Sequence, residues 1–359
     1  MMRWMRILAG DAIFPVARDG ALRLKNVKVI AGAAGGPKWL VLYHFDRHLA
    51  SLIKSEALGS ESLTLIGSSI GAWRMAALGC ADPVKVMDEF FEAYMAQRYS
   101  LKPSVKEITS EARRILDILM PPGRTVEPLD HPRCRLAIIT VRHRMIGNSD
   151  NTLPLTCSVA LIGLVNLISR RAMKYLVKRV VFADKRNGLP LDFDRDTFST
   201  EIVPLSERNL RDALLASGAI PLVMESIRNI EGAPPGTYRD GGIIDYHLDI
   251  PYRLDDGFFV LQPHYTDKII PGWFDKYRPR SPSSTNLRNV LLVCPTKALV
   301  ESLPGGKIPD RNDFYAFKGR DAERLSYWRK AVEAGKRMAD EFFEALESGR
   351  IRECVEPIR

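Results

Sequence analysis

The chain has 359 residues, of which 46% are hydrophobic and 26% are charged, so it can bury the core of an ordinary globular protein. Its formal net charge is +9, and a basic surface of this kind favours anionic partners. The sequence has no zinc-finger spacing, no ribonucleoprotein aromatic motif and no dense Lys/Arg tract. We therefore expect no nucleic-acid partner.

The cysteines and the N-terminus indicate the compartment. The 5 cysteines are scattered and form no C-x-x-C pair, which argues against a disulfide framework and against a zinc site. The first residues lack the apolar run of about 7–15 residues that a signal peptide needs. His44 and His48 lie on one predicted helix without a nearby carboxylate ligand, so we interpret them as surface or packing residues. We expect a cytoplasmic protein that needs no metal and no cofactor.

Strands and helices alternate along the chain. This pattern predicts an α/β fold with a largely parallel sheet and helices on both faces. The main unit should span residues 27–300, with an N-terminal segment at 1–26 and a C-terminal helical extension at 301–359. In chain order, we expect strands at 27–31, 62–66, 135–141, 179–183, 258–262 and 290–294, helices at 37–58, 70–78, 83–100, 103–120 and 321–346, and an exposed loop at 278–286.

A serine-containing glycine turn stands between a predicted buried strand and a predicted helix. Residues 67–71 read Gly-Ser-Ser-Ile-Gly and fit the pattern G-x-S-x-G. In such an elbow, side chains at Gly67 and Gly71 would clash with neighbouring backbone, and Ser69 is exposed at the carboxyl edge of the sheet. The competing interpretation is a glycine-rich turn with no chemistry.

A nucleophilic serine also needs hydrogen-bond donors for the oxyanion. The turn after the first predicted strand, residues 32–36, can aim several backbone N–H groups at one point. We predict that Gly32, Ala33 and Ala34 supply these groups, with Gly35 next. A phosphate site is the competing hypothesis, but the sequence has neither a Walker motif nor G-x-G-x-x-G.

The base is predicted to be an aspartate. Histidine is the usual partner of serine, but Asp240 precedes Gly241 and Gly242, and this turn could present its carboxylate to Ser69 without steric cover. By itself, D-G-G is an ordinary turn. An unperturbed aspartate with a pKa near 3.9 is a poor base for an alcohol, so this assignment requires a dry pocket that raises the pKa, or concerted proton transfer.

Together and in this order, the oxyanion turn, G-x-S-x-G and D-G-G resemble the patatin-like phospholipase family. Residues 216–221, Ala-Ser-Gly-Ala-Ile-Pro, also resemble the A-S-x-A-x-P stretch that usually precedes the family's D-G-G. The resemblance covers about residues 27–251. It implies a three-layer α/β/α sandwich and a lipid acyl-ester hydrolase of the phospholipase A or lysophospholipase type. Ser69 would form the acyl-enzyme, Asp240 would act as base, and free fatty acid would be released.

One departure from the family concerns the oxyanion turn, which is typically G-G-G-x-[KR]-G. This chain has Ala-Gly-Ala-Ala-Gly-Gly at 31–36, so the basic residue is displaced or missing, and Lys38 is the nearest one. Backbone N–H groups survive such changes. The altered turn also suggests the main non-enzymatic alternative, a lipid-binding or scaffolding protein on the same fold.

Two further enzyme classes compete with this assignment. Acyltransferases with a related sheet have a G-H-S-x-G elbow, and Ser68 stands here in the place of their histidine. An α/β-hydrolase with a histidine base would need His247 or His264.

A long apolar run lies in an insertion at about residues 150–180. Residues 153–169 are nearly uncharged, but the run is shorter than the roughly 20 residues of a transmembrane helix. It predicts either a buried core helix or an interfacial segment in contact with an anionic membrane. In the second case, the lipid-facing cations would be Arg170, Arg171, Lys174 and Lys178.

Overall fold

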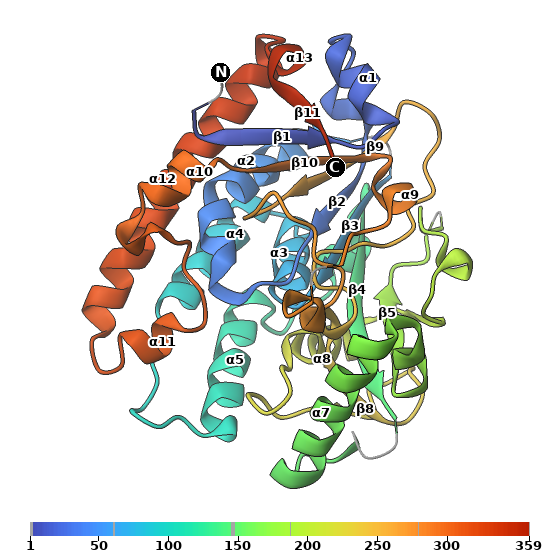
Figure 1. Cartoon of the computed structure of the whole chain (residues 1–359), viewed down its shortest axis with the longest axis vertical. Coiled ribbons are helices and arrows are strands. Elements are labelled where there is room, and N and C mark those ends of the chain that lie inside the picture. The colour runs from blue at the N-terminus through green and yellow to red at the C-terminus, as the bar shows by residue number, and fades with distance from the viewer. Residues whose placement is uncertain (1–2, 60–61, 145–147, 187, 279, 359) are drawn as a thin grey trace.

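We describe a computed structural model of the chain, covering residues 3–59, 62–144, 148–186, 188–278 and 280–358 (Figure 1). The strands are β1 Met5–Ala9, β2 Val27–Gly32, β3 Leu63–Ser68, β4 Cys134–His143, β5 Val177–Ala183, β6 Thr200–Pro204, β7 Ile227–Arg228, β8 Thr237–Asp240, β9 Phe259–Pro263, β10 Val290–Pro295 and β11 Val355–Pro357. The α-helices are α1 Ile13–Arg18, α2 Tyr43–Lys54, α3 Ile70–Leu78, α4 Pro83–Met95, α5 Val105–Leu119, α6 Glu127–Asp130, α7 Thr152–Ile168, α8 Glu207–Gly218, α9 Ser284–Leu287, α10 Lys297–Glu301, α11 Asp313–Ala316, α12 Asp321–Glu347 and α13 Ile351–Cys354. The 3₁₀ turns are η1 Leu24–Asn26, η2 Gly36–Leu42, η4 Arg170–Tyr175, η5 Phe193–Arg195, η6 Gly241–Ile243, η7 Trp273–Lys276 and η8 Pro304–Gly306.

The strands form one mostly parallel sheet, which confirms the predicted fold class. Its order is β11-β1-β10-β9-β2-β3-β4-β5-β6, and β8 pairs with β4 and β7. The central strands β10, β9, β2, β3 and β4 run parallel, whereas β5 and β8 are antiparallel to β4. The carboxyl ends of β2 and β3 therefore lie side by side, and these are the ends from which the two glycine-rich turns leave the sheet.

Alternate residues of the central strands are buried on opposite faces of the sheet. In β4, Leu136 and Ile138 pack into the larger hydrophobic cluster, whereas Ala137 and Ile139 pack into a second cluster on the other face. Helices α2, α3, α4, α5, α8 and α12 contribute to the first cluster and gather on one side of the sheet (Figure 1). The second face is covered largely by irregular segments at 189–193 and 248–254 and by the short helix α9. A strand buried on both faces explains why these runs are almost wholly apolar.

The chain ends contribute to the same sheet. β1 pairs antiparallel with β10 and parallel with β11, so both ends of the described chain lie at one edge of the sheet (Figure 1). Within the C-terminal region, α12 packs on α2, where Phe342 and Phe343 each place their rings 5.0 Å from Phe45. β1, which has only five residues, was not anticipated from the sequence.

Most predicted elements form close to their expected bounds. Helix α3 spans the predicted residues 70–78, and α12 ends one residue beyond its predicted end. The helix predicted at 37–58 begins instead with the 3₁₀ turn η2, which has Pro37 near its start, and α2 ends at Lys54. Of the predicted loop 278–286, Pro279 lies outside the described residues, and the end of the loop forms α9.

No helix among residues 3–59, 62–144, 148–186, 188–278 and 280–358 is both long enough and apolar enough to cross a bilayer. The apolar run predicted at 153–169 forms α7, which packs one stripe of residues inward, formed by Leu155, Ser158, Ile162 and Asn166. Other leucine and isoleucine side chains of α7 lie in solvent, and Leu164 is 56% and Ile168 78% exposed. The segment is therefore not a fully buried core helix.

Candidate functional site

Ser69 lies on a sharp turn between β3 and α3. Its backbone has φ 55° and ψ −131°, a conformation that is uncommon for a residue other than glycine. The turn is fixed by Ser217, whose hydroxyl accepts a hydrogen bond from the Ser69 N–H at 2.9 Å and donates one to the Ile139 carbonyl at 2.7 Å. Ser217 belongs to the stretch at 216–221 that the sequence analysis singled out, and its contact gives that stretch a structural role.

Close backbone packing explains the glycines of the elbow. A Cβ atom on Gly71 would lie 1.9 Å from the Gly32 carbonyl oxygen, so α3 can approach the end of β2 only without a side chain there. Gly67 is constrained in the same way, because its Cβ would lie 2.4 Å from the Ala72 nitrogen. These contacts join the first glycine-rich turn to the elbow.

Asp240 meets Ser69 from a distant part of the chain. The Ser69 hydroxyl donates a hydrogen bond of 2.7 Å to Oδ2 of Asp240, although the two residues are 171 positions apart. Asp240 ends β8, where it pairs with Thr140 of β4, and its Oδ1 accepts the Gly242 N–H at 2.7 Å. A Cβ on Gly241 would lie 2.4 Å from the Ile139 carbonyl oxygen, so this glycine lets the turn pass close to the backbone of β4.

Burial raises the pKa of Asp240 to about 6. The hydrogen bonds from Ser69 and Gly242 and the positive charges of Arg311 and Lys276 act in the opposite direction and favour the ionised carboxylate. Asp240 therefore lies in the dry environment that a raised pKa requires. A carboxylate with this pKa is a stronger base than an exposed aspartate and is still ionised near neutral pH.

The histidines are not arranged as bases for Ser69. The small cavity that contains Ser69 and Asp240 has no histidine in its lining. His247 bonds Tyr265 through Nε2 at 2.7 Å and the Lys268 carbonyl through Nδ1 at 2.9 Å. Tyr265 in turn donates to the Ala34 carbonyl at 2.6 Å, so His247 supports the glycine-rich turn rather than the serine.

The backbone N–H groups that line the cavity of Ser69 are not all those that the sequence predicted. Gly32 and Ala33 do not line the cavity, and the Ala34 N–H donates to the Tyr246 carbonyl at 2.9 Å. These three residues were the first choice for the oxyanion, and the structure corrects that order. Gly35 and Gly36 do line the cavity, and within the described part of the chain their N–H groups have no acceptor. Of the four predicted residues, Gly35 thus has an unengaged N–H at the cavity, and Gly36 joins it.

A larger apolar cavity of about 300 Å³ opens on the other side of Ser69. Its wall combines aromatic and aliphatic side chains from α3, α4, α5, α8 and α11 and the segments next to them, including Trp73, Tyr94, Ile115, Val223 and Phe314. Gly36, Ser69, Ile220 and Arg311 line both cavities. Ser69 therefore lines both the larger cavity and the smaller one, whose wall also includes Asp240 and Lys276.

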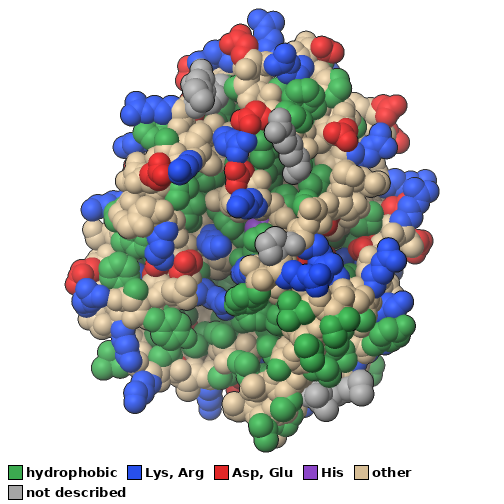
Figure 2. All heavy atoms as spheres, viewed as in Figure 1, with side chains coloured by type: hydrophobic (Ala, Val, Ile, Leu, Met, Phe, Trp, Pro, Cys, Tyr) green, Lys and Arg blue, Asp and Glu red, His purple; other side chains and the backbone are tan. Residues whose placement is uncertain are grey.

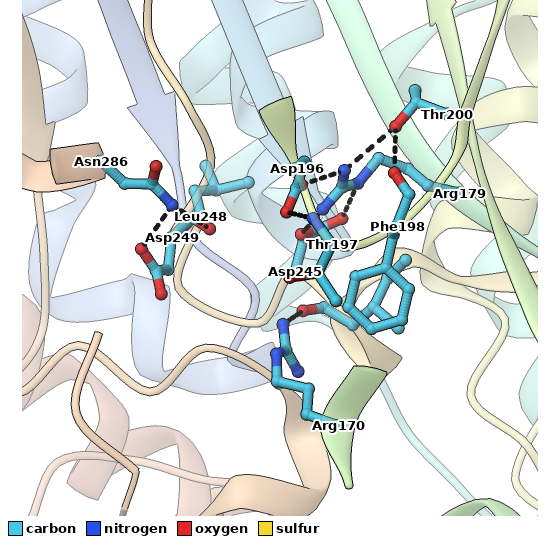
Figure 3. Close-up of polar contacts among 12 residues, drawn as sticks. Arg170, Arg179, Asp196, Thr197, Phe198, Thr200, Asp245, Leu248, Asp249 and Asn286 are labelled. Carbon is cyan, nitrogen blue, oxygen red and sulfur yellow. Dashed lines mark hydrogen bonds and ion pairs between the residues drawn. The ribbon is translucent and has the colours of Figure 1, made fainter. Parts of the chain in front are cut away.

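A buried ionic network holds the chain just beyond the D-G-G turn (Figure 3). Arg179 donates two hydrogen bonds of 2.6 Å to the carboxylate of Asp245 and also pairs with Asp196 and Thr200. Removing either partner of such a buried pair leaves an uncompensated charge. The sequence offered no signal for this network, because its members come from β5, the loop before β6, the start of β6 and the turn after η6.

The four basic residues predicted to face a membrane do not share one environment. Arg170 is held inside by Asp275 at 3.1 Å and by the Ile244 carbonyl at 2.6 Å (Figure 3 shows the second contact), so its assignment to a lipid surface is corrected. Lys178 lies in β5 and pairs with Glu201 at 2.8 Å. Arg171 and Lys174 are exposed in η4, which follows α7 in the chain.

Neither family models nor curated proteins yield a match to this chain. Among the described residues, there is no group of three or more His, Cys, Asp or Glu side chains that could hold a metal ion.

We predict that Gly71→Ala destabilises the fold, because the new methyl group would collide with the backbone carbonyl of Gly32. Overpacking of this kind lowers the free energy of unfolding by about 1–3 kcal/mol. Urea denaturation measures the change. Gly218→Ala is the matched control, because its Cβ would meet Trp73 at an ordinary 3.6 Å. Equal stability of the two variants would contradict the proposed close contact.

Proposed function

We propose that the protein is a serine hydrolase of lipid acyl esters that uses Ser69 and Asp240 as a catalytic dyad. The observation that carries this proposal is the 2.7 Å hydrogen bond from the Ser69 hydroxyl to Asp240 at the entrance of an apolar cavity. The resemblance to patatin-like phospholipases, carried by G-x-S-x-G, D-G-G and the stretch at 216–221, supports the same activity.

The proposed reaction proceeds in two steps. Ser69 Oγ attacks the ester carbonyl carbon while its proton moves to Asp240, and the N–H groups of Gly35 and Gly36 stabilise the oxyanion. The alcohol leaves with the proton from Asp240, and an acyl-enzyme remains. Water then attacks the acyl carbon, Asp240 accepts its proton, and collapse of the intermediate returns this proton to Ser69 and releases the fatty acid. Each good oxyanion donor contributes about 3–4 kcal/mol.

The surroundings favour a dyad over the alternatives. His247 is committed to Tyr265 and Lys268, which speaks against a histidine base. The apolar cavity suits an acyl chain, and its volume of about 300 Å³ lies at the lower end of the range for small-molecule sites. The raised pKa of Asp240 suits a general base rather than a scaffold residue.

A fluorophosphonate probe should label Ser69 covalently, because the reaction needs an activated serine. Asp240→Asn should lower the labelling rate and esterase activity by at least about 100-fold, the loss typical of a missing general base. Ser68→Ala serves as the matched control and should still be labelled, since Ser68 is buried and makes no hydrogen bond to Asp240. Intact-mass and peptide mass spectrometry give the readout. A folded protein that remains unlabelled would instead favour the binding or scaffolding role.

The activity on a neutral ester should fall as the pH drops through about 6, because protonation of Asp240 removes the base. Arg311→Gln should move this acidic limb to higher pH, since the Arg311 charge lowers the pKa of Asp240. Arg329→Gln, an exposed change on α12, is the control. The measurement is kcat/KM between pH 4.5 and 8. If the limb of Arg311→Gln coincides with that of the wild type, the electrostatic assignment is wrong.

We also propose that α7 rests on an anionic membrane surface. Figure 2 shows hydrophobic side chains gathered over α7 at the lower right of this face, and Arg171 and Lys174 are exposed in η4, which packs against α7. An exposed apolar helix face beside cations is typical of interfacial helices. Arg170 and Lys178 are engaged within the protein and are excluded from this surface.

The double variant Arg171→Gln/Lys174→Gln should bind phosphatidylserine vesicles more weakly than the wild type, by about 1 kcal/mol per removed charge at low salt. The difference should shrink at high salt because of screening. Co-sedimentation measures both. Lys330→Gln/Lys336→Gln, on the exposed side of α12, is the matched control. Unchanged binding of the first variant would exclude this part of the surface as the docking site.

A further inference from the structure

Two cationic side chains line the smaller cavity beside Ser69, and a third lies near them. Lys276 of η7 and Arg311 of the segment before α11 line the same small cavity as Ser69 and Asp240. Lys38 of η2 lies close enough for its charge to lower the pKa of Lys276. Figure 2 shows Lys and Arg side chains around a hollow near the middle of this face. Three distant segments of the chain therefore bring positive charge to one place.

None of these cations is neutralised by an ion pair within the described residues. They lie over aromatic rings instead, with Lys276 Nζ 3.8 Å from the centroid of Tyr246, Lys38 Nζ 4.9 Å from Tyr265 and Arg311 Cζ 5.9 Å from Trp273. Contacts with ring faces hold a cation in position and leave its N–H donors available.

The carboxylates nearest to the cations have other partners. Asp310 pairs with Lys307 at 3.3 Å, and Asp240 accepts the Ser69 hydroxyl. Burial and the charges of Lys38 and Arg311 lower the pKa of Lys276 to about 7, although the negative charges of Asp240 and Asp310 act to raise it. Burial likewise lowers the pKa of Lys38. Such a cluster is electrostatically unfavourable when empty, and a bound anion would relieve the repulsion.

The two cavities can hold different parts of an ester whose carbonyl group lies at Ser69. An acyl chain on the apolar side places the scissile ester at Ser69, so the alcohol part of the ester extends toward Lys276 and Arg311. An uncharged alcohol would leave the cations unpaired. A headgroup with its own ammonium would bring a further positive charge into the cluster. A phosphate monoester carries a charge of about −1.5 to −2 at pH 7 and offers three acceptor oxygens, which suits several converging donors.

We propose that Lys276 and Arg311, with Lys38 nearby, form a phosphate-binding subsite for the leaving group, so that the preferred substrates are acyl esters of a phosphorylated alcohol without a cationic group. This inference rests on the proposed esterase function and specifies its substrate class. The cations bind the phosphate of the alcohol, and the acyl chain fills the apolar cavity.

The subsite gives the reaction a second pH dependence. Lys276 is protonated below about pH 7, so it binds the phosphate there and loses its charge as the pH rises. Asp240 becomes ionised above about pH 6. For a phosphorylated ester, kcat/KM should therefore form a bell with a falling limb near 7, whereas a neutral ester should show only the rising limb. The charged groups facing Lys276 are Lys38, Arg311, Asp240 and Asp310.

The test compares three esters with one acyl chain, used below their critical micelle concentrations: an acylglycerol 3-phosphate, a monoacylglycerol and an acylglycerophosphocholine. At pH 6.5 and low salt, the wild type should favour the first by at least about tenfold in kcat/KM, the scale of one charge-assisted contact. Lys276→Gln and Arg311→Gln should each reduce this preference by about tenfold. Lys330→Gln should keep it. Lys276→Arg should retain the preference for the phosphorylated ester. Its kcat/KM should no longer fall above about pH 7, because arginine remains charged.

A binding experiment with the full chain makes the result independent of turnover. Ser69→Ala should bind sn-glycerol 3-phosphate by calorimetry, and the added Lys276→Gln or Arg311→Gln change should weaken that binding. Tighter binding of glycerol 3-phosphate than of inorganic phosphate supports a headgroup site. Equal or tighter binding of inorganic phosphate identifies a free-phosphate site and overturns the headgroup assignment. Thermal melting verifies that each variant is folded.

The two proposals fail in different ways. Ser69-dependent hydrolysis without preference for the phosphorylated ester would overturn the subsite and leave the esterase intact. Absence of both hydrolysis and probe labelling would overturn the esterase. In that case, the calorimetric result alone decides whether Lys276 and Arg311 form an anion site.

Discussion

The hydrogen bond between Ser69 and Asp240 is the constraint on which the arrangement of the site depends. Its two ends are 171 residues apart, and its length of 2.7 Å requires that β3 and β8 be placed accurately against β4. β4 achieves this by pairing parallel with β3 and antiparallel with β8. The Ile139 carbonyl of the same strand then accepts the Ser217 hydroxyl that holds the backbone of Ser69. One central strand thus positions both members of the pair.

The electrostatics of the site balance burial against nearby positive charge. Burial raises the pKa of Asp240, and a carboxyl that was protonated at neutral pH would be unable to accept a proton. Two local hydrogen bonds and the charges of Arg311 and Lys276 limit that rise, and the resulting pKa is about 6. The same two cations stand where the alcohol part of an ester would lie. Removing either one should therefore affect the base as well as any bound anion, which is why the matched neutral and charged substrates are needed.

The sequence predicted the parts of this site that depend on local backbone chemistry. The elbow at Ser69 and the turn at Asp240 need glycines because of close backbone contacts. These glycines are visible in the sequence as G-x-S-x-G and D-G-G. Strands β2, β3, β4, β9 and β10 were predictable because both of their faces are buried. The individual oxyanion amides were not, because the commitment of the Ala34 N–H to the Tyr246 carbonyl depends on a tertiary contact. Lys276 ends the short 3₁₀ turn η7 and Arg311 lies in an irregular segment, and neither belongs to a motif, so only the folded chain shows that they meet.

Helix α7 illustrates why composition could not separate the two hypotheses for the apolar run. A core helix and an interfacial helix have the same apolar content, and they differ in what their second face contacts. The polar residue Asn166 occurs in this apolar run because its amide donates a hydrogen bond of 2.8 Å to Asp275. Arg170 and Arg280 bond the same carboxylate, and Lys276 is the next residue in the chain. The inner stripe of α7 therefore anchors η7, which carries Lys276 of the smaller cavity, while the outer leucines remain in solvent. The Asn166–Asp275 hydrogen bond thus joins the helix of the proposed membrane surface to the turn that carries Lys276.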